Sequence, residues 1–415
     1  MAIPKPLKYI ADFEQMGFGL FVHWGLYSQM GKGEWIFDNI DMPMEEYAKL
    51  KDTFTACDFD ADKLCEFAHT AGCKYIILTT KHHEGFCLYD ANGLNDDFDA
   101  PHSPAGRDLV REFVDACNRH DIKPFFYHAT LDWFKKDEYD NDWDAYLEYI
   151  RQSVEVLCKN YGKIGGFWFD GNWSKRDADW KVSELYKTIR KYQPEAMIVN
   201  NTGMIARGAL GDIEIDSVTF EQGTPEPMDR EGMPKYLAAE MCQTTNNHWG
   251  FGANDINHKS PAELIENLCA CRKVGANYLL NIGPMAQGAI DPYQIELFKL
   301  IGTWMGHFGE AIYNGRPYGA KCFGKNFILK SADGKSLYIF VHELDTGGSV
   351  DVMVGGKYKG AYGFSGVSDK IKSLKWMDNG EDLKFIQGEG MLCFDATGYE
   401  YGKSLVVRVA KAEIE

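Results

Sequence analysis

Two acidic residues each end a run of apolar residues, the position at which a buried strand presents its last side chain. Asp170 closes the segment FWFD, and Glu221 closes the segment VTFE. Opposed carboxylates on neighbouring strands can hydrolyse a glycosidic bond, because one attacks the anomeric carbon while the other donates and then takes back a proton. A single acid at a strand end is more often a helix cap or an ion-pair partner. The pair favours catalysis, since Trp168 and Phe169 would keep the surroundings of Asp170 dry.

A group of histidines offers a different chemistry. His23, His82, His83 and His128 also end apolar runs, and imidazoles gathered around Asp170 could bind zinc, as in metal-dependent barrel hydrolases. Two observations argue against a metal. The first apolar run ends in His-Trp-Gly rather than in a His-x-His pair, and adjacent side chains at a strand end are expected to point in opposite directions. We therefore predict hydrogen bonds from these histidines to sugar hydroxyls, and no metal or other cofactor.

Two further segments are weaker candidates. The segment KGEW, which contains Glu34 and Trp35, follows the first apolar run and places a carboxylate beside an aromatic ring. This suits a clamp on a sugar or an ordinary loop anchor. The segment from His248 to Gly250 is consistent with a lid or with plain packing around Trp249. The chain has no phosphate-binding glycine loop and no Gly-x-Ser-x-Gly nucleophile elbow, which excludes two common enzyme classes.

The candidate residues end eight short apolar runs that are separated by helical patterns. Continuous apolar runs of this length are typical of strands buried on both faces, as in a parallel sheet. Eight strand-helix units predict a (β/α)8 TIM barrel, in which polar residues at the C-terminal ends of the strands build the site. The predicted strands span residues 18–23, 74–80, 122–128, 164–170, 196–200, 215–221, 237–243 and 277–282.

Helix signals fill the intervals between these runs. Residues 107–120 repeat apolar side chains at helical spacing, and the sequence Ser260-Pro-Ala-Glu is a capping box that opens another helix. Gly72, Asp121 and Gly275 stand where helices should end before the next strand. Local signals and the barrel prediction therefore agree.

The pattern changes after residue 315. Apolar and polar residues alternate there, and Asp-Gly, Asn-Gly and Gly-Gly turns interrupt them, as in the predicted strand SVDVMVGG (349–356). This pattern predicts an antiparallel β-sandwich. We expect two domains, a catalytic barrel over residues 1–314 and a C-terminal sandwich over residues 315–415.

Composition limits the class of partner. The 415-residue chain has a formal net charge of -17, which on average repels nucleic acid and anionic membrane surfaces. No run approaches the roughly 18 apolar residues of a membrane span. The N-terminal segment lacks the apolar core of a signal peptide, and the cysteines lie mostly among apolar neighbours, so we expect a cytoplasmic protein with reduced thiols. The sequence does not decide between a monomer and a homo-oligomer.

Several segments together resemble those of a known family. They are FGLFVHWGLYS (18–28), GEW (33–35), YIILTTKHHEGFCLYD (75–90), GRDLVREFVDAC (106–117), FWFDG (167–171) and NYLLNIGP (277–284). In this order they resemble glycoside hydrolase family 29, the α-L-fucosidases, across nearly the whole predicted barrel, and TKHHEGF is highly specific. The family's architecture, a (β/α)8-like barrel followed by a C-terminal β-sandwich, agrees with the periodicity.

The resemblance implies a retaining mechanism without a metal or cofactor, acting on terminal α-L-fucose of an oligosaccharide or glycoconjugate. The family nucleophile, the aspartate after the aromatic strand, falls on Asp170. The fucose-binding positions of the family fall on His23, Glu34, Trp35, His82, His83 and Tyr127, and Trp168 and Trp249 fall on positions that line the pocket.

The acid/base is assigned through a second motif, because family members take it from different places. A common family pattern, Asp-x-x-Thr-x-Glu, matches the segment from Asp216 to Glu221 without a gap. Glu221 is therefore the expected acid/base. Glu226 and Glu240 are the competing candidates.

One segment departs from the family pattern. Some members carry a sugar-contacting arginine shortly after the strand that ends here at Asn200, whereas this chain has Asn201 and Thr202, and Arg207 is the nearest substitute. The linkage preference is therefore open. Two alternatives also stay open, a fucose-binding homologue without activity and an exo-glycosidase for a related sugar such as galactose.

Overall fold

The computed structural model describes residues 2–201, 212–346 and 360–415. The chain divides into two compact units. One holds residues 1–259 and 277–298, and the other holds residues 260–276 and 299–415. Across the described ranges, no helix has both the length and the hydropathy that crossing a membrane requires. The domain boundary predicted at residue 314 stays a prediction.

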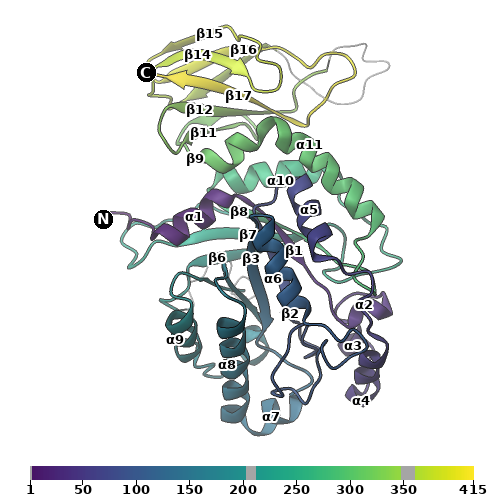
Figure 1. Ribbon diagram of the computed structural model, residues 1–415. Helices are drawn as coiled ribbons and strands as arrows, with labels where there is room; N and C mark the ends of the chain where they lie inside the picture. The colour runs from purple at the N-terminus through teal and green to yellow at the C-terminus, as the bar shows by residue number, and fades with distance from the viewer. Residues whose placement is uncertain (1, 202–211, 347–359) are drawn as a thin grey trace. The chain divides into compact units, whose positions relative to one another are not determined.

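The first unit contains a closed barrel of eight parallel strands, each paired with the next along the chain, and β8 pairs with β1 (Figure 1). Every residue of β1, β2 and β8 is buried, which explains their unbroken apolar runs. The predicted barrel is confirmed. Its strands are β1 (Phe18–Val22), β2 (Tyr75–Lys81), β3 (Lys123–Ala129), β4 (Gly166–Asp170), β5 (Met197–Asn200), β6 (Ser217–Glu221), β7 (Ala238–Thr244) and β8 (Asn277–Ile282).

Helices between the strands begin and end at the residues that favour such ends. The Asp60 carboxylate caps α5 by accepting the Lys63 backbone N–H, and Asp108 caps α6 in the same way. Helix α5 ends at Gly72, whose φ of 87° is left-handed. The main helices of this unit are α1 (Lys8–Met16), α5 (Ala61–Ala71), α6 (Leu109–Arg119), α8 (Trp143–Asn160) and α9 (Val182–Tyr192).

Large side chains fill the barrel interior. Tyr75, Tyr127 and Trp168 are buried in one core cluster, and Gly19 leaves space for them, since a Cβ there would lie 2.3 Å from the Tyr75 ring. The Glu240 carboxylate, on β7, accepts hydrogen bonds from the Tyr75 hydroxyl at 2.5 Å and from the Trp168 indole at 3.0 Å. Burial raises the pKa of Glu240 to about 7. The strand that ends in Asp170 is thus anchored from inside the barrel.

The second unit contains two antiparallel sheets, with strand orders β10-β13-β16-β15 and β14-β17-β12-β11-β9. Side chains from both sheets form one apolar core, which confirms the predicted sandwich. The predicted strand at 349–356 lies outside the described residues. Helix α10 (Pro261–Lys273) belongs to this unit, and the Ser260 side chain caps it by accepting the Glu263 N–H, as its sequence predicts. Helix α11 spans Pro292–Asn314, and the strands are β9 (Gly315–Pro317), β10 (Lys321–Cys322), β11 (Phe327–Ser331), β12 (Ser336–His342), β13 (Gly360–Ser365), β14 (Ile371–Trp376), β15 (Phe385–Gly388), β16 (Met391–Ala396) and β17 (Val407–Ile414).

Candidate active site

Asp170, the last residue of β4, is surrounded by hydrogen-bond donors. Its Oδ2 accepts the Tyr127 hydroxyl at 3.0 Å and lies 3.4 Å from His83 Nε2. Its Oδ1 accepts the Trp173 indole at 2.9 Å and the Asn201 amide at 3.3 Å. Burial by itself raises the pKa of this carboxyl, but the surrounding donors, His83 foremost, outweigh it and hold the pKa below its usual value. Asp170 is therefore ionised at neutral pH, as a nucleophile must be.

Glu221 is the last residue of β6, and its pKa is shifted in the opposite direction to that of Asp170. Burial, and next the negative charge of Asp170, raise the pKa of Glu221 to about 7. Its Oε2 accepts a hydrogen bond from Asn201 Nδ2 at 2.6 Å. A carboxyl with this pKa is protonated in weakly acidic solution and can lose its proton near neutrality, which are the requirements for a general acid that later acts as a base.

The spacing of the two acids follows from their common partner. Asp170 Oδ1 and Glu221 Oε2 both accept a hydrogen bond from Asn201 Nδ2. The distance between these two oxygens therefore cannot exceed the sum of the two hydrogen-bond lengths. An approach this close of one oxygen from each acid suits the ~5–5.5 Å carboxyl separation of retaining glycosidases better than the ~6.5–9.5 Å of inverting ones. The two strands are not neighbours, contrary to the sequence interpretation. Strand β5 lies between β4 and β6, and Asn201 follows it directly.

The competing carboxylates lie elsewhere. Glu240 is in the barrel interior, with its two oxygens bound by Tyr75 and Trp168. Glu226 is exposed in the segment between β6 and β7. Of the three glutamates, Glu221 is the one that shares a hydrogen-bond partner with Asp170.

Neutral imidazoles line the wall next to the acids. His23 Nδ1 is hydrogen-bonded to Asn281 Oδ1 at 2.7 Å, and the His23 ring lies 5.6 Å from that of His82 and 5.3 Å from that of Tyr127. Burial lowers the pKa of His23 to about 3 and that of His82 well below its usual value. A neutral imidazole has one donor and one acceptor, which matches a sugar hydroxyl better than two donors would.

His82 and His83 do not point in opposite directions, so this interpretation of the sequence is wrong. Strand β2 ends at Lys81, and the alternation of side chains ends with it. The two rings lie 4.3 Å apart, and both contribute to the same wall. Within the described ranges, no three or more His, Cys, Asp or Glu side chains are arranged to hold a metal ion.

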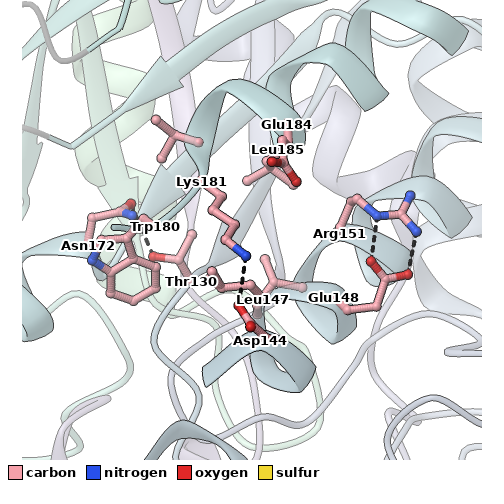
Figure 2. Close-up of a pocket in the computed structure, with 12 residues that line it drawn as sticks. Thr130, Asp144, Leu147, Glu148, Arg151, Asn172, Trp180, Lys181, Glu184 and Leu185 are labelled. Atoms are coloured by element: carbon pink, nitrogen blue, oxygen red, sulfur yellow. Dashed lines mark hydrogen bonds and ion pairs between the residues drawn. The ribbon is translucent and has the colours of Figure 1, made fainter. Parts of the chain in front are cut away.

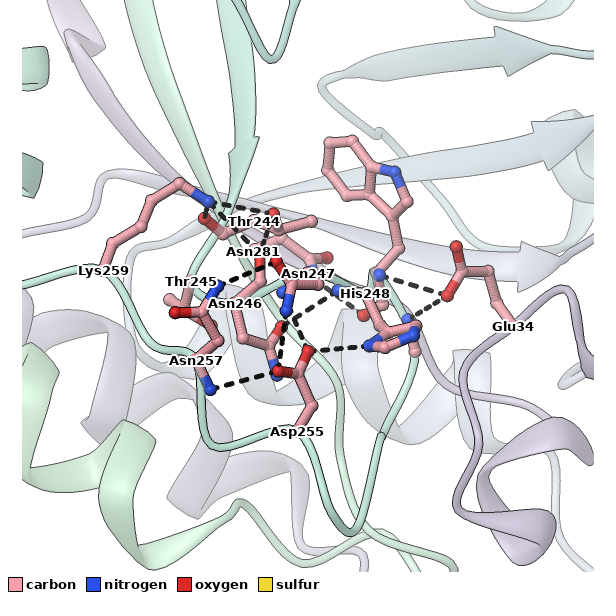
Figure 3. Close-up of polar contacts among 12 residues, drawn as sticks. Glu34, Thr244, Thr245, Asn246, Asn247, His248, Asp255, Asn257, Lys259 and Asn281 are labelled. Atoms are coloured by element: carbon pink, nitrogen blue, oxygen red, sulfur yellow. Dashed lines mark hydrogen bonds and ion pairs between the residues drawn. The ribbon is translucent and has the colours of Figure 1, made fainter.

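Glu34 joins the loop after β1 to the loop after β7. Its Oε2 accepts the backbone N–H groups of Trp249 at 3.1 Å and Gly250 at 2.8 Å (Figure 3). The Trp249 ring lies 5.1 Å from that of His23, and the Trp249 carbonyl accepts the Asn281 amide. The predicted residues Glu34, His23 and Trp249 are thus brought together at one side of the site.

A compact turn holds the loop after β7 in place. Asp255 accepts hydrogen bonds from the backbone N–H of Asn247 at 2.8 Å and from its side-chain amide at 3.0 Å. The same carboxylate lies 2.7 Å from His248 Nδ1, and Figure 3 shows these contacts converging on Asp255. The turn therefore fixes the residue next to Trp249. Asp255 was not among the sequence candidates.

An aromatic wall closes another side of the site. The Trp35 ring lies 5.5 Å from that of His83, 5.1 Å from that of Trp133 and 5.7 Å from that of Trp173. Trp133 and Trp173 were missed as site residues. Each follows the end of a barrel strand by a few residues, and an aromatic residue in that position is the signal that would have found them.

Two strand-end residues point away from the acids. Side chains alternate along β3, so His128 points outward where its neighbour Tyr127 points into the barrel. His128 is hydrogen-bonded there to Ser153 on α8 at 3.1 Å. The Asn200 amide donates to the Tyr186 hydroxyl on α9 at 2.8 Å. Arg207, the proposed substitute for a family arginine, lies outside the described residues.

A pocket of about 90 Å³ is lined by residues of α8, of the start of α9 and of the segments that follow β3 and β4 (Figure 2). Thr130 Oγ1 donates to the Asp170 backbone carbonyl at 2.9 Å and to Asn172 Oδ1 at 3.2 Å, and an ion pair joins Lys181 to Asp144. The lining residues of this pocket include neither Asp170 nor Glu221. Through its hydrogen bond to the Asp170 carbonyl, Thr130 supports the backbone that carries the nucleophile candidate.

Comparison with known proteins places the chain among its relatives. The family model for alpha-L-fucosidase matches residues 5–310. The tissue alpha-L-fucosidase of Bos taurus is 28% identical over 373 residues, which cover 81% of this chain and 75% of that protein. Alpha-L-fucosidase isoenzyme 1 from Paenibacillus thiaminolyticus has a TM-score of 0.82 at 28% identity, covering 98% of this chain and 99% of that one. A fucosidase from Bacteroides thetaiotaomicron, trapped as a covalent intermediate, shares the fold with a TM-score of 0.84 at 22% identity, covering 100% of this chain and 98% of that one. Since the family model spans most of the sequence, the chain belongs to the alpha-L-fucosidase family, glycoside hydrolase family 29.

Proposed function

We propose that this protein is a retaining exo-glycosidase that hydrolyses terminal α-L-fucose from oligosaccharides or glycoconjugates, with Asp170 as nucleophile and Glu221 as acid/base. The observation that carries the proposal is the pair itself, since the two carboxylates share one hydrogen-bond partner and have pKa values shifted in opposite directions. Family membership adds support. The Bacteroides fucosidase, whose covalent intermediate was trapped with 2-fluoro-fucosyl fluoride, uses the same fold.

In the first step, an Asp170 oxygen attacks the anomeric carbon of fucose, and the bond from that carbon to the glycosidic oxygen breaks. The Glu221 proton moves to the departing oxygen, so the aglycone leaves as an alcohol. A covalent fucosyl ester on Asp170 results. The donors around Asp170 keep it ionised until it reacts.

In the second step, Glu221 takes a proton from water, and the water oxygen attacks the anomeric carbon as its bond to Asp170 breaks. Ester formation has by then removed the negative charge of Asp170, which is one of the two main causes of the raised pKa of Glu221. The same residue therefore becomes easier to ionise when a base is needed. Two inversions at one carbon leave the configuration unchanged.

The pocket residues have separate tasks in this proposal. His23, His82 and His83 offer donor and acceptor atoms to the sugar hydroxyls, and Trp35 and Trp249 offer aromatic faces to its apolar side. Tyr127 stacks on Trp168 with ring centroids 5.7 Å apart and donates to Asp170. Glu34 holds Trp249 in position through backbone hydrogen bonds.

The test of the nucleophile is release of nitrophenol from an aryl α-L-fucoside, with the wild type run beside Asp170→Ala. We expect turnover by the wild type and a loss of several orders of magnitude in the variant. NMR of the first-formed fucose should show the α-anomer. Near-normal activity of Asp170→Ala, or β-fucose as the first product, would falsify the assignment.

The test of the acid/base compares two variants with the wild type. Glu221→Ala should lose most of its activity on the aryl fucoside and regain part of it with azide, which can enter the vacated space and attack the ester. Glu226→Ala is the matched control in an exposed position, and we expect wild-type rates from it. Azide rescue of Glu226→Ala instead would move the role to that residue. Binding of fucose without turnover by the wild type would favour a binding protein.

A further inference from the structure

Asn201 occupies the position between the two acids. Its Nδ2 donates to Asp170 Oδ1 at 3.3 Å and to Glu221 Oε2 at 2.6 Å, and 5% of the residue is exposed. An amide nitrogen carries two hydrogens, so it can donate one to each carboxylate. The two catalytic candidates are therefore joined through one side chain, which directly follows the strand between them.

The Asn201 amide is itself held from both sides. Its Oδ1 accepts the Thr219 hydroxyl at 3.1 Å, and its backbone N–H donates to the Phe169 carbonyl at 2.8 Å. Thr219 is two residues before Glu221 on β6, and Phe169 directly precedes Asp170 on β4. The strands that carry the acids thus also orient the amide that joins them.

We infer that Asn201 is a positioning residue, an uncharged clamp that fixes the spacing of Asp170 and Glu221. This inference rests on the proposed function. A clamp with a positive charge would attract both carboxylates, but it would also stabilise their ionised forms and remove the proton from the acid. A neutral amide holds the same geometry while the negative charge of Asp170 still acts on Glu221.

The decisive variant is Asn201→Asp, which keeps the shape and places a third carboxylate at the clamp. Repulsion should raise the pKa of both acids, so both limbs of the kcat/KM profile on an aryl α-L-fucoside should move to higher pH by about one unit. We expect kcat to fall by about tenfold or more, with a much smaller change in KM. Thr219→Val, which releases the amide without adding charge, should lower kcat in the same direction by a smaller factor.

The matched control is Asn200→Asp. Asn200 is equally buried and adjacent in the chain, but its amide faces Tyr186 and Asn172. This variant should keep both pH limbs of the wild type. Equal limb positions in Asn201→Asp and the wild type, with folding verified by thermal melting, would overturn the inference. A wild type that cleaves no fucoside would instead refute the proposed function, so the two failures are distinguishable.

Discussion

At the scale of single residues, the barrel gives two chemically similar acids opposite protonation. Glu221 has few donors and a negative neighbour, whereas Asp170 has donors at both of its oxygens. Since Glu221 must carry a proton to start the reaction, kcat/KM should fall as pH rises through about 7. The measurement is a pH profile on a nitrophenyl fucoside. A dinitrophenyl fucoside, whose leaving group needs no proton, should lose this alkaline limb; if both substrates keep it, the limb belongs to another group.

A substitution at Tyr127 tests the protonation of Asp170. Its hydroxyl is one of the donors that hold the pKa of Asp170 below its usual value. Tyr127→Phe keeps the ring stacked on Trp168 and removes this donor. The pKa of Asp170 should then rise, which moves the acid limb of kcat/KM to higher pH and lowers kcat by about tenfold, the scale of one charge-assisted hydrogen bond of roughly 1.5 kcal/mol. An unchanged acid limb would show that Tyr127 only packs.

At the scale of elements, the loops after β1 and β7 form one wall because Glu34 binds the backbone of both Trp249 and Gly250. Asp255 holds a turn within the loop after β7 through its contacts with Asn247 and His248. In Asp255→Ala the turn loses its acceptors, so Trp249 should be held less firmly; we expect KM to rise by about tenfold with little change in kcat. Steady-state kinetics beside the exposed control Asp137→Ala would check this. A fall in kcat alone would place the effect at the acids instead.

Local features of the strands and helices decide how much of the fold and of the site could be predicted from the sequence. The strands were predictable because most of their residues are buried and a polar residue stands at or beside the C-terminal end of each. The helices were predictable because their caps are local. Asp170 and Glu221 follow from those strand ends. The side-by-side arrangement of His82 and His83 depends on where strand β2 ends. The hydrogen bonds from Asn201 to both acids depend on how β4, β5 and β6 lie next to one another in the barrel. Neither property is local in sequence. Trp173 lies in a short 3-10 helix, Asn172–Lys175, whose direction no periodicity encodes.

At the scale of the whole molecule, buried titratable groups couple folding to pH. Burial lowers the pKa of His23 to about 3 and those of His82 and His128 well below 6.5. Burial also raises the pKa of Glu84 to about 8 and that of Glu240 to about 7. The histidines contribute stability that is present above pH 6.5 and is lost as pH falls, whereas the glutamates contribute stability that is present below about 4.5 and is lost as pH rises. Between these values the two sets of groups act in opposite directions, so their effects on the free energy of unfolding partly cancel.

His128 allows one of these slopes to be isolated, because it packs against α8 and away from the acids. Below pH 6.5 the unfolded chain protonates this histidine and the folded chain does not, so the wild type loses stability there relative to His128→Gln. The loss should be about 1.4 kcal/mol per pH unit, the value of one proton, and should vanish above pH 6.5. Urea unfolding of both proteins from pH 5 to 8 gives the difference directly, and unrelated groups cancel in it. If the difference between the wild type and His128→Gln shows no such slope, His128 takes up its proton in the folded barrel as readily as in the unfolded chain.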